Sequence, residues 1–156
     1  MSTQNPHGLI DQSKLGYKND YLYRITVKGL IINESGEVLV VKESGRTCWD
    51  LPGGGMDHGE DIKSAIAREL NEEVNLNSNF TYKVIHVDDP VYLTNTNVLQ
   101  IRLVFQIFPE LMEFSEGADA DIISFINPDS LKDSDNLLER RIYDYAKMAS
   151  YMAVSS

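Results

Sequence analysis

The segment that most constrains this sequence runs from residue 54 to residue 76, where a glycine-rich loop leads into an acidic helix. The loop at 51–55 reads Leu-Pro-Gly-Gly-Gly, and Asp61 is a suitable N-cap for a helix that begins directly after it. A helix is therefore predicted over 62–74. Carboxylates spaced i, i+3 and i+4 share one helix face. In this helix they are Glu69, Glu72 and Glu73.

The three carboxylates on this helix repel one another when they are ionised. Neighbouring carboxylates raise one another's pKa, so solvent or a cation must compensate their charge. Glutamate pairs on a helix are usually a solvated face. The fixed spacing to a glycine loop favours a binding site instead, because glycine lets the backbone approach an ion or a phosphate. Magnesium prefers carboxylate oxygens combined with substrate phosphates, so the segment predicts a magnesium site.

Apolar periodicity elsewhere predicts a set of strands. They are expected at 21–32, 38–41, 80–86, 97–108 and 122–126. The run at 38–41 is continuously apolar, as in a strand buried on both faces. Turn-forming residues at 33–36 predict that the first two strands pair as a hairpin. An amphipathic helix at 138–152 closes the chain. One mixed sheet between helices, an α/β fold, is the expected architecture.

Composition and charge limit the class of protein. The 156 residues suffice for one domain, which we expect at 20–152 after a flexible arm at 1–19. The net charge of −10 disfavours a nucleic acid duplex as partner. Cys48 is the single cysteine, so no intramolecular disulfide forms, which suits a reducing compartment. No apolar run typical of a signal peptide or a membrane span is present, and we expect a cytoplasmic location without a membrane partner.

The spacing of the loop and helix resembles the Nudix (MutT-like) hydrolase signature. The matching residues are Gly54, Glu60, Arg68, Glu69, Leu70, Glu72, Glu73 and Leu76, and Trp49, Leu51 and Pro52 flank them as in the family. Asn75 departs from the expected glycine, but asparagine tolerates a left-handed backbone. The resemblance implies an alpha/beta/alpha sandwich with a mixed sheet. It also implies hydrolysis of a nucleoside diphosphate linked to another moiety, with magnesium or manganese as cofactor.

The resemblance also implies roles for individual residues. Glu69, Glu72 and Glu73 match metal-binding carboxylates, and the carbonyl of Gly53 matches a backbone ligand. Arg68, Glu60 and Gly54 match residues that support the loop and helix, and Arg68 belongs with Glu69 and Glu73 to the catalytic set. The general base varies within the family. Glu69 is one candidate here, and Glu116, in the acidic loop at 113–121, is the other.

The substrate stays open at this point. Pro90 matches a feature of ADP-ribose hydrolases, while Tyr92 matches one of dinucleoside polyphosphate hydrolases, so neither decides. The preferred substrates are nucleoside triphosphates, including oxidised ones, or conjugates such as ADP-ribose, taken by a monomer or a homodimer. Aromatic residues that could stack on a base are more often core residues, and basic residues that could contact phosphate are not ranked: they are Tyr21, Tyr23, Tyr92, Phe105, Arg24, Lys42, Arg46 and Arg102.

Two other functions remain as alternatives. The first is a Nudix-fold module that senses nucleotides without hydrolysing them, although a sensor would not need the full set of carboxylates. The second is isopentenyl diphosphate isomerisation, which uses a catalytic cysteine on the same fold. Cys48 lies near the glycine loop, but no supporting motif accompanies it.

Overall fold

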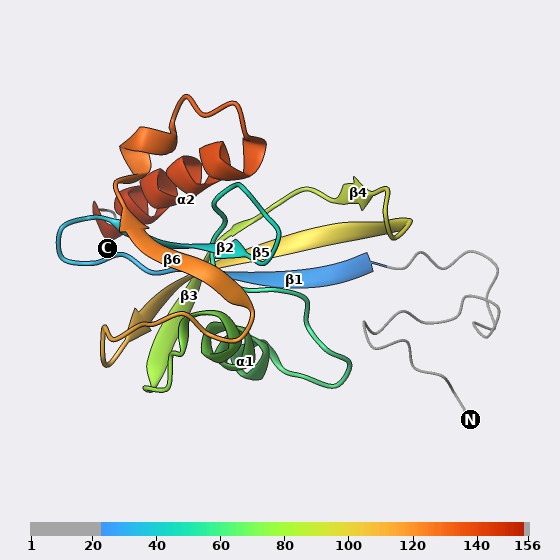
Figure 1. The fold of residues 1–156 in the computed structure, drawn as a ribbon, viewed down its shortest axis with the longest axis horizontal. Helices are drawn as coiled ribbons and strands as arrows, with labels where there is room; N and C mark the ends of the chain where they lie inside the picture. Colours follow the sequence, from blue (N-terminus) through green and yellow to red (C-terminus); the bar gives the residue numbers. More distant parts are fainter. Residues whose placement is uncertain (1–22, 155–156) are drawn as a thin grey trace.

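The computed structural model describes residues 23–154, with side chains described as far as residue 150 (Figure 1). The predicted flexible arm at 1–19 lies outside the described residues. The strands are β1 (Tyr23–Leu30), β2 (Val38–Glu43), β3 (Phe80–Val87), β4 (Val91–Leu93), β5 (Val98–Pro109) and β6 (Ala120–Ile126). The helices are α1 (Ile62–Val74), the short 3-10 helix η2 (Pro128–Leu131) and α2 (Leu137–Val154).

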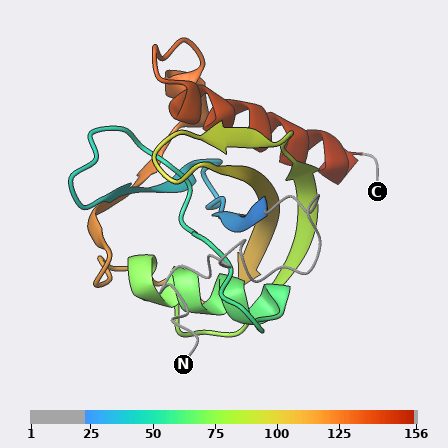
Figure 2. The same ribbon diagram turned by 90° about the vertical axis from the view of Figure 1, so that its right-hand side faces the viewer.

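The strands form a mixed sheet and a smaller antiparallel pair. In the mixed sheet β5 is paired in parallel with β1 on one side and antiparallel with β3 and β4 on the other. Strands β2 and β6 form the second sheet. Figure 2 shows the strands lying between α1 and α2. The α/β fold class with a mixed sheet is therefore confirmed.

Each helix covers its own hydrophobic cluster. On the α1 side, Leu70 packs with residues that include Val27 and Phe105. On the α2 side, Ile142 packs with residues that include Leu30. The burial of Phe105 agrees with its assignment as a core residue. None of the helices in the described part of the chain is long and apolar enough to cross a membrane.

The hairpin predicted between the first two strands is present only next to its turn, because β1 and β2 belong to different sheets. Strand β1 pairs with β5, and β2 pairs with β6. At the turn that joins them, Ile32 and Val38 form an antiparallel bridge, and the amides of Asn33 and Leu39 donate to the carbonyls of Glu37 and Ile31. The other edge of β1 is occupied by the glycine segment 52–56: its backbone accepts from the amides of Val27 and Gly29, and Met56 donates to Ile25. A hairpin partner would need that edge.

The remaining predictions of secondary structure hold in most places. The strands at 80–86, 97–108 and 122–126 are present with ends shifted by a few residues. Strand β4 and the helix η2 were missed, and the closing helix is confirmed. Residues 38–41 are fully buried, as a strand covered on both faces requires.

Helix α1 begins and ends as its capping residues predict. The Asp61 side chain accepts a hydrogen bond from the amide of Ser64 at 2.7 Å. Asn75 adopts the left-handed conformation with φ of 53° and terminates the helix. Asparagine thus adopts the left-handed conformation for which glycine is usual at this position. Having Asn75 in place of the glycine of the signature leaves the helix intact.

Candidate functional site

The glycine segment is held between β1 and α1 by close backbone packing. Gly53 has φ of 128°, and a Cβ atom there would lie 2.2 Å from the carbonyl oxygen of Val27. A Cβ at Gly54 would lie 2.6 Å from Oε2 of Glu69. A Cβ at Gly55 would collide with the guanidinium of Arg24. The three glycines therefore let the loop fit between a strand, a carboxylate and an arginine.

Replacing Gly53 by alanine is expected to destabilise the protein by about 3 kcal/mol or more, because strained backbone and a backbone clash add together. Gly59 is the matched control: it lies in the same loop with φ of 89°, but no atom lies within 4 Å of its Cβ position. Gly59→Ala should cost only about 1 kcal/mol. Urea denaturation of both variants measures the difference. Equal losses would contradict the close packing described here.

Arg68 connects the helix to the loop. Its Nε and Nη2 atoms donate to the two oxygens of Glu60, at 2.7 and 3.0 Å. Nη2 also donates to the carbonyl of Gly55 at 3.0 Å. The planar fork of the guanidinium suits this bidentate contact. Arg68 thus links Glu60 and the glycine segment to the helix.

Arg68 also lies between two of the helix carboxylates. Its Nη1 atom donates to Glu69 Oε1 at 2.7 Å and to Glu72 Oε2 at 3.2 Å. Burial raises the pKa of Glu69, and the contact with Arg68 opposes that rise. The carboxylate of Glu69 packs directly against Gly54. Glu72 is more exposed than Glu69.

Glu73 is the most buried carboxylate of the helix. Only 4% of the residue is exposed, and its Oε2 accepts a hydrogen bond from the amide of Gly53 at 2.6 Å. Burial raises its pKa from the ordinary 4.5 to about 8, with partial opposition from the charge of Lys28 and from the Gly53 amide. This carboxylate would therefore carry a full charge at neutral pH only with additional positive charge nearby.

The chemistry of these carboxylates fits a divalent cation. Within residues 23–154, no three His, Cys, Asp or Glu side chains are grouped closely enough to hold one ion, because Glu69 and Glu72 face Arg68 while Glu73 faces Gly53. The donors are nevertheless hard oxygens of the kind that magnesium prefers. The under-compensated charge of buried Glu73 is what a cation would offset. We take the residues to fit such an ion.

The acidic loop is attached to the end of α1 through main-chain atoms. The amides of Ser115, Gly117 and Asp119 donate to the last carbonyls of the helix, at Val74, Glu73 and Glu72. A Cβ at Gly117 would lie 2.1 Å from the carbonyl oxygen of Glu72. Glu116 is exposed within this loop, and its carbonyl accepts from Asn75 Nδ2 at 2.8 Å. The structure therefore places the Glu116 segment beside the helix that carries the other acids.

A family model described as NUDIX domain matches residues 22–145. The chain belongs to this family. An RNA pyrophosphohydrolase from Actinobacillus pleuropneumoniae is 46% identical over 54 residues, which cover 35% of this chain and 26% of that protein. A putative 8-oxo-dGTP diphosphatase from Bacillus subtilis is 40% identical over 55 residues, which cover 35% of this chain and 37% of the relative. The Nudix chain thus spans a minor part of the length of these relatives.

A solved structure shows the same fold over most of the Nudix chain. The MutT protein from Methanosarcina mazei Go1 superposes with a TM-score of 0.68 at 22% sequence identity. The superposition covers 85% of this chain and 98% of that chain. At this level of identity the likeness establishes the fold.

A buried polar cluster on the α2 side of the sheet was missed by sequence reasoning. Lys28, Asp50 and Arg102 are all at least nine-tenths buried, and Asp50 forms ion pairs with Lys28 at 3.0 Å and with Arg102 at 3.2 Å. These two cations lower the pKa of Asp50 against the effect of its burial. The available signal was the polar face of the alternating strands, which includes Lys28 and Arg102. Arg102 is thus bound to Asp50, not displayed for phosphate.

The other residues considered for nucleotide contact are dispersed. Tyr92 is exposed on β4, and its hydroxyl donates to Asn97 Oδ1 at 2.8 Å. Lys42 lies over the Trp49 ring at 4.3 Å from its centroid. Arg46 pairs with Glu43 at 3.0 Å. Tyr21 lies outside the described residues.

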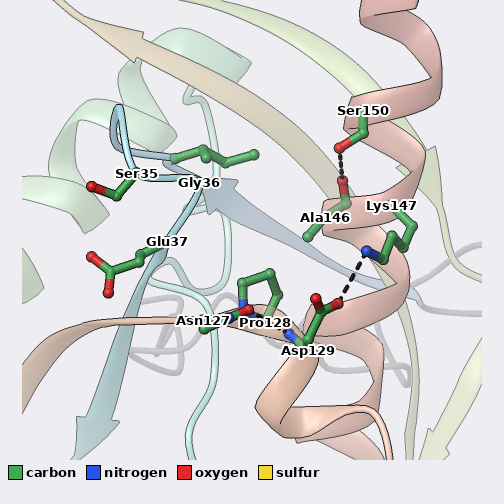
Figure 3. Close-up of a pocket in the computed structure, with 10 residues that line it drawn as sticks. Ser35, Gly36, Glu37, Asn127, Pro128, Asp129, Ala146, Lys147 and Ser150 are labelled. Atoms are coloured by element: carbon green, nitrogen blue, oxygen red, sulfur yellow. Dashed lines mark hydrogen bonds and ion pairs between the residues drawn. The ribbon is translucent and has the colours of Figure 1, made fainter.

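A separate cleft with a volume of about 390 Å³ lies between the β1–β2 turn, η2 and α2 (Figure 3). Its lining includes Ser35, Glu37, Asn127 and Ser150, along with an ion pair between Lys147 and Asp129 at 3.0 Å. None of its lining residues belongs to the glycine segment or to α1. The cleft is therefore distinct from the candidate site.

Proposed function

We propose that this Nudix chain is a metal-dependent hydrolase of nucleoside diphosphates linked to another moiety, acting by attack of water on phosphorus. The observation that carries the proposal is the placement of Glu73 and Glu69 against Gly53 and Gly54. It puts two carboxylates with raised pKa beside a backbone segment that has no side chains. Sites of this kind favour an oxygen-bound cation and a phosphate group.

The residues have distinct tasks in this proposal. Glu69, Glu72 and Glu73, with the carbonyl of Gly53, would hold Mg²⁺, or Mn²⁺ in its place. When bound, the ion would screen the diphosphate charge and lower the pKa of the attacking water. Arg68 fixes the carboxylates relative to the loop. Positioning and charge compensation supply most of the catalysis in phosphoryl chemistry.

A general base accepts the proton of the attacking water. We propose Glu69 or Glu116 for this task. Glu69 is supported by its position beside Gly54 and by its raised pKa, which brings it closer to the pKa that proton transfer at neutral pH favours. Glu116 is supported by the attachment of its loop to the end of α1. Separate Glu69→Gln and Glu116→Gln variants would distinguish them through the acidic limb of the pH–rate profile.

The substrate class is proposed from the family and from the names of relatives. Nucleoside triphosphates, including oxidised ones, and conjugates such as ADP-ribose remain the preferred substrates. The name of the Actinobacillus relative, RNA pyrophosphohydrolase, adds RNA to the set of compounds for testing. We propose a cytoplasmic location, which the single cysteine of the chain supports. We also propose that the protein is a monomer or a homodimer.

The test is a screen of purified protein against these compounds with and without magnesium. The expected result is release of a nucleoside monophosphate, or of pyrophosphate or phosphate, from at least one compound. Excess chelator should abolish the release, and added Mg²⁺ or Mn²⁺ should restore it. Tight nucleotide binding in a calorimeter without any product would instead support the nucleotide-sensing module.

A further inference from the structure

The buried Lys28 makes contacts that the proposed function has not used. Its ammonium donates to the carbonyls of Leu51 and Gly53, at 3.0 and 2.5 Å, and lies 3.0 Å from Oδ2 of Asp50. An ammonium has three N–H donors, so these contacts can use all of them. The residue is only 3% exposed. A cation buried this deeply is retained only with good partners. Besides Asp50, the ammonium has Glu43 Oε1 at 4.0 Å and two main-chain carbonyls, of which that of Gly53 belongs to the glycine segment.

Gly53 joins Lys28 to the acidic helix. Its carbonyl accepts from Lys28, while its amide donates to Glu73 Oε2 at 2.6 Å. Lys28 and Glu73 therefore form hydrogen bonds to the same glycine, one to its carbonyl and the other to its amide. Because Gly53 has φ of 128° and lies against the carbonyl of Val27, this peptide has little freedom to adjust by itself. Lys28 and Glu73 are the side chains that bind its carbonyl and its amide.

We propose that Lys28 is a positioning residue for the candidate metal site: it orients Gly53 and thereby fixes the carboxylate of Glu73. The inference rests on the proposed function, since it assigns Glu73 to a metal site. Lys28 acts through the carbonyl of Gly53, which has a second lone pair for the ion, and does not itself touch the ion or the substrate.

Arg102 provides a matched control in the same cluster. It is a cation, it is buried, and it forms an ion pair with Asp50, as Lys28 does. The contacts described for its guanidinium go to Asp50 and not to the glycine segment. Lys28→Met and Arg102→Met each remove one buried positive charge and each leave Asp50 with one cation. They differ in one respect: Lys28→Met removes a hydrogen bond to the carbonyl of Gly53, and Arg102→Met does not.

The experiment is titration of each purified variant with Mn²⁺, followed by electron paramagnetic resonance of the free ion. Lys28→Met should weaken Mn²⁺ binding by about 10-fold to 100-fold, as losses of supporting contacts around metal ligands do, while Arg102→Met should change it by less than about threefold. Equal affinities in Lys28→Met and the wild type, tighter binding in Lys28→Met, or equal weakening in both variants would overturn the proposal. Thermal unfolding at saturating Mn²⁺ separates a loss of affinity from a loss of fold.

A second variant covers the case in which Lys28→Met does not fold. Lys28→Met combined with Asp50→Asn and Arg102→Met removes all three charges of the buried cluster, a change that proteins tolerate better than loss of one member. The same weakening of Mn²⁺ binding is expected, and unchanged affinity would count against the inference. A wild-type protein that binds no Mn²⁺ would overturn the proposed metal site as well. Binding by the wild type that Lys28→Met preserves would overturn the role of Lys28 alone.

Discussion

Glu73→Gln is expected to lower magnesium-dependent turnover by at least about 100-fold, because it removes a charged ligand from the metal site. Glutamine keeps an oxygen that can accept from the amide of Gly53, the contact that Glu73 makes at 2.6 Å. The fold should therefore persist. Steady-state kinetics on the best substrate from the screen, with circular dichroism of both proteins, measures the two effects separately.

The control for this substitution is Glu110→Gln. Glu110 is an exposed glutamate beyond the end of β5. The same change of charge there should leave turnover within about twofold of the wild type, since it alters only surface electrostatics. Full activity of Glu73→Gln would remove Glu73 from the set of metal ligands. A loss that is equal in both variants would point to net charge as the cause.

The second large effect concerns stability against pH in the presence of a chelator. The pKa of Glu73 is raised in the folded protein from 4.5 to about 8, so between these values the folded state holds a proton that the unfolded state releases. Stability then falls as pH rises through this window, by up to about 1.4 kcal/mol per pH unit. Below 4.5 the carboxyl is protonated in both states, and the favourable contribution is complete.

Glu73→Gln should remove this contribution to the pH dependence. Urea denaturation at intervals from pH 5 to pH 9, with chelator present, gives the free energy of unfolding for both proteins. The difference in the free energy of unfolding between the variant and the wild type should move in favour of the variant with each step up to about pH 8 and should then level off. Glu69 also has a raised pKa, but it is present in both proteins and cancels in the comparison. Parallel curves would show that Glu73 ionises in the folded protein near its ordinary pKa.

Local features of the fold were predictable because neighbours in sequence decide them. The start of α1 at Asp61 and its end at Asn75 follow from capping chemistry within one turn of helix. The spacing of the three glutamates alone puts them on one face. Strand β4 escaped prediction because it has only three residues, two of them exposed, which leaves almost no periodic signal.

Strand pairing was not predictable in the same way. The partner of Tyr23 is Leu99, in parallel, and the turn at 33–36 carries no information about that distant strand. The cluster of Lys28, Asp50 and Arg102 depends on this pairing, because β1 and β5 must lie side by side before the two cations share one aspartate. The helix acids could therefore be predicted from the sequence, whereas the buried charges behind the glycine segment could not.

The way in which the acidic loop is attached to α1 affects which of its residues can change during evolution. The loop is held by amide-to-carbonyl bonds, so the side chains at 113 and 116 have no part in keeping it in place. At Gly117 the side chain does matter, since a larger residue would collide with the carbonyl of Glu72. Substitutions at 113 and 116 can accumulate without detaching the segment. Descendants of this chain could change their reactive side chain there while the anchoring glycine stays the same.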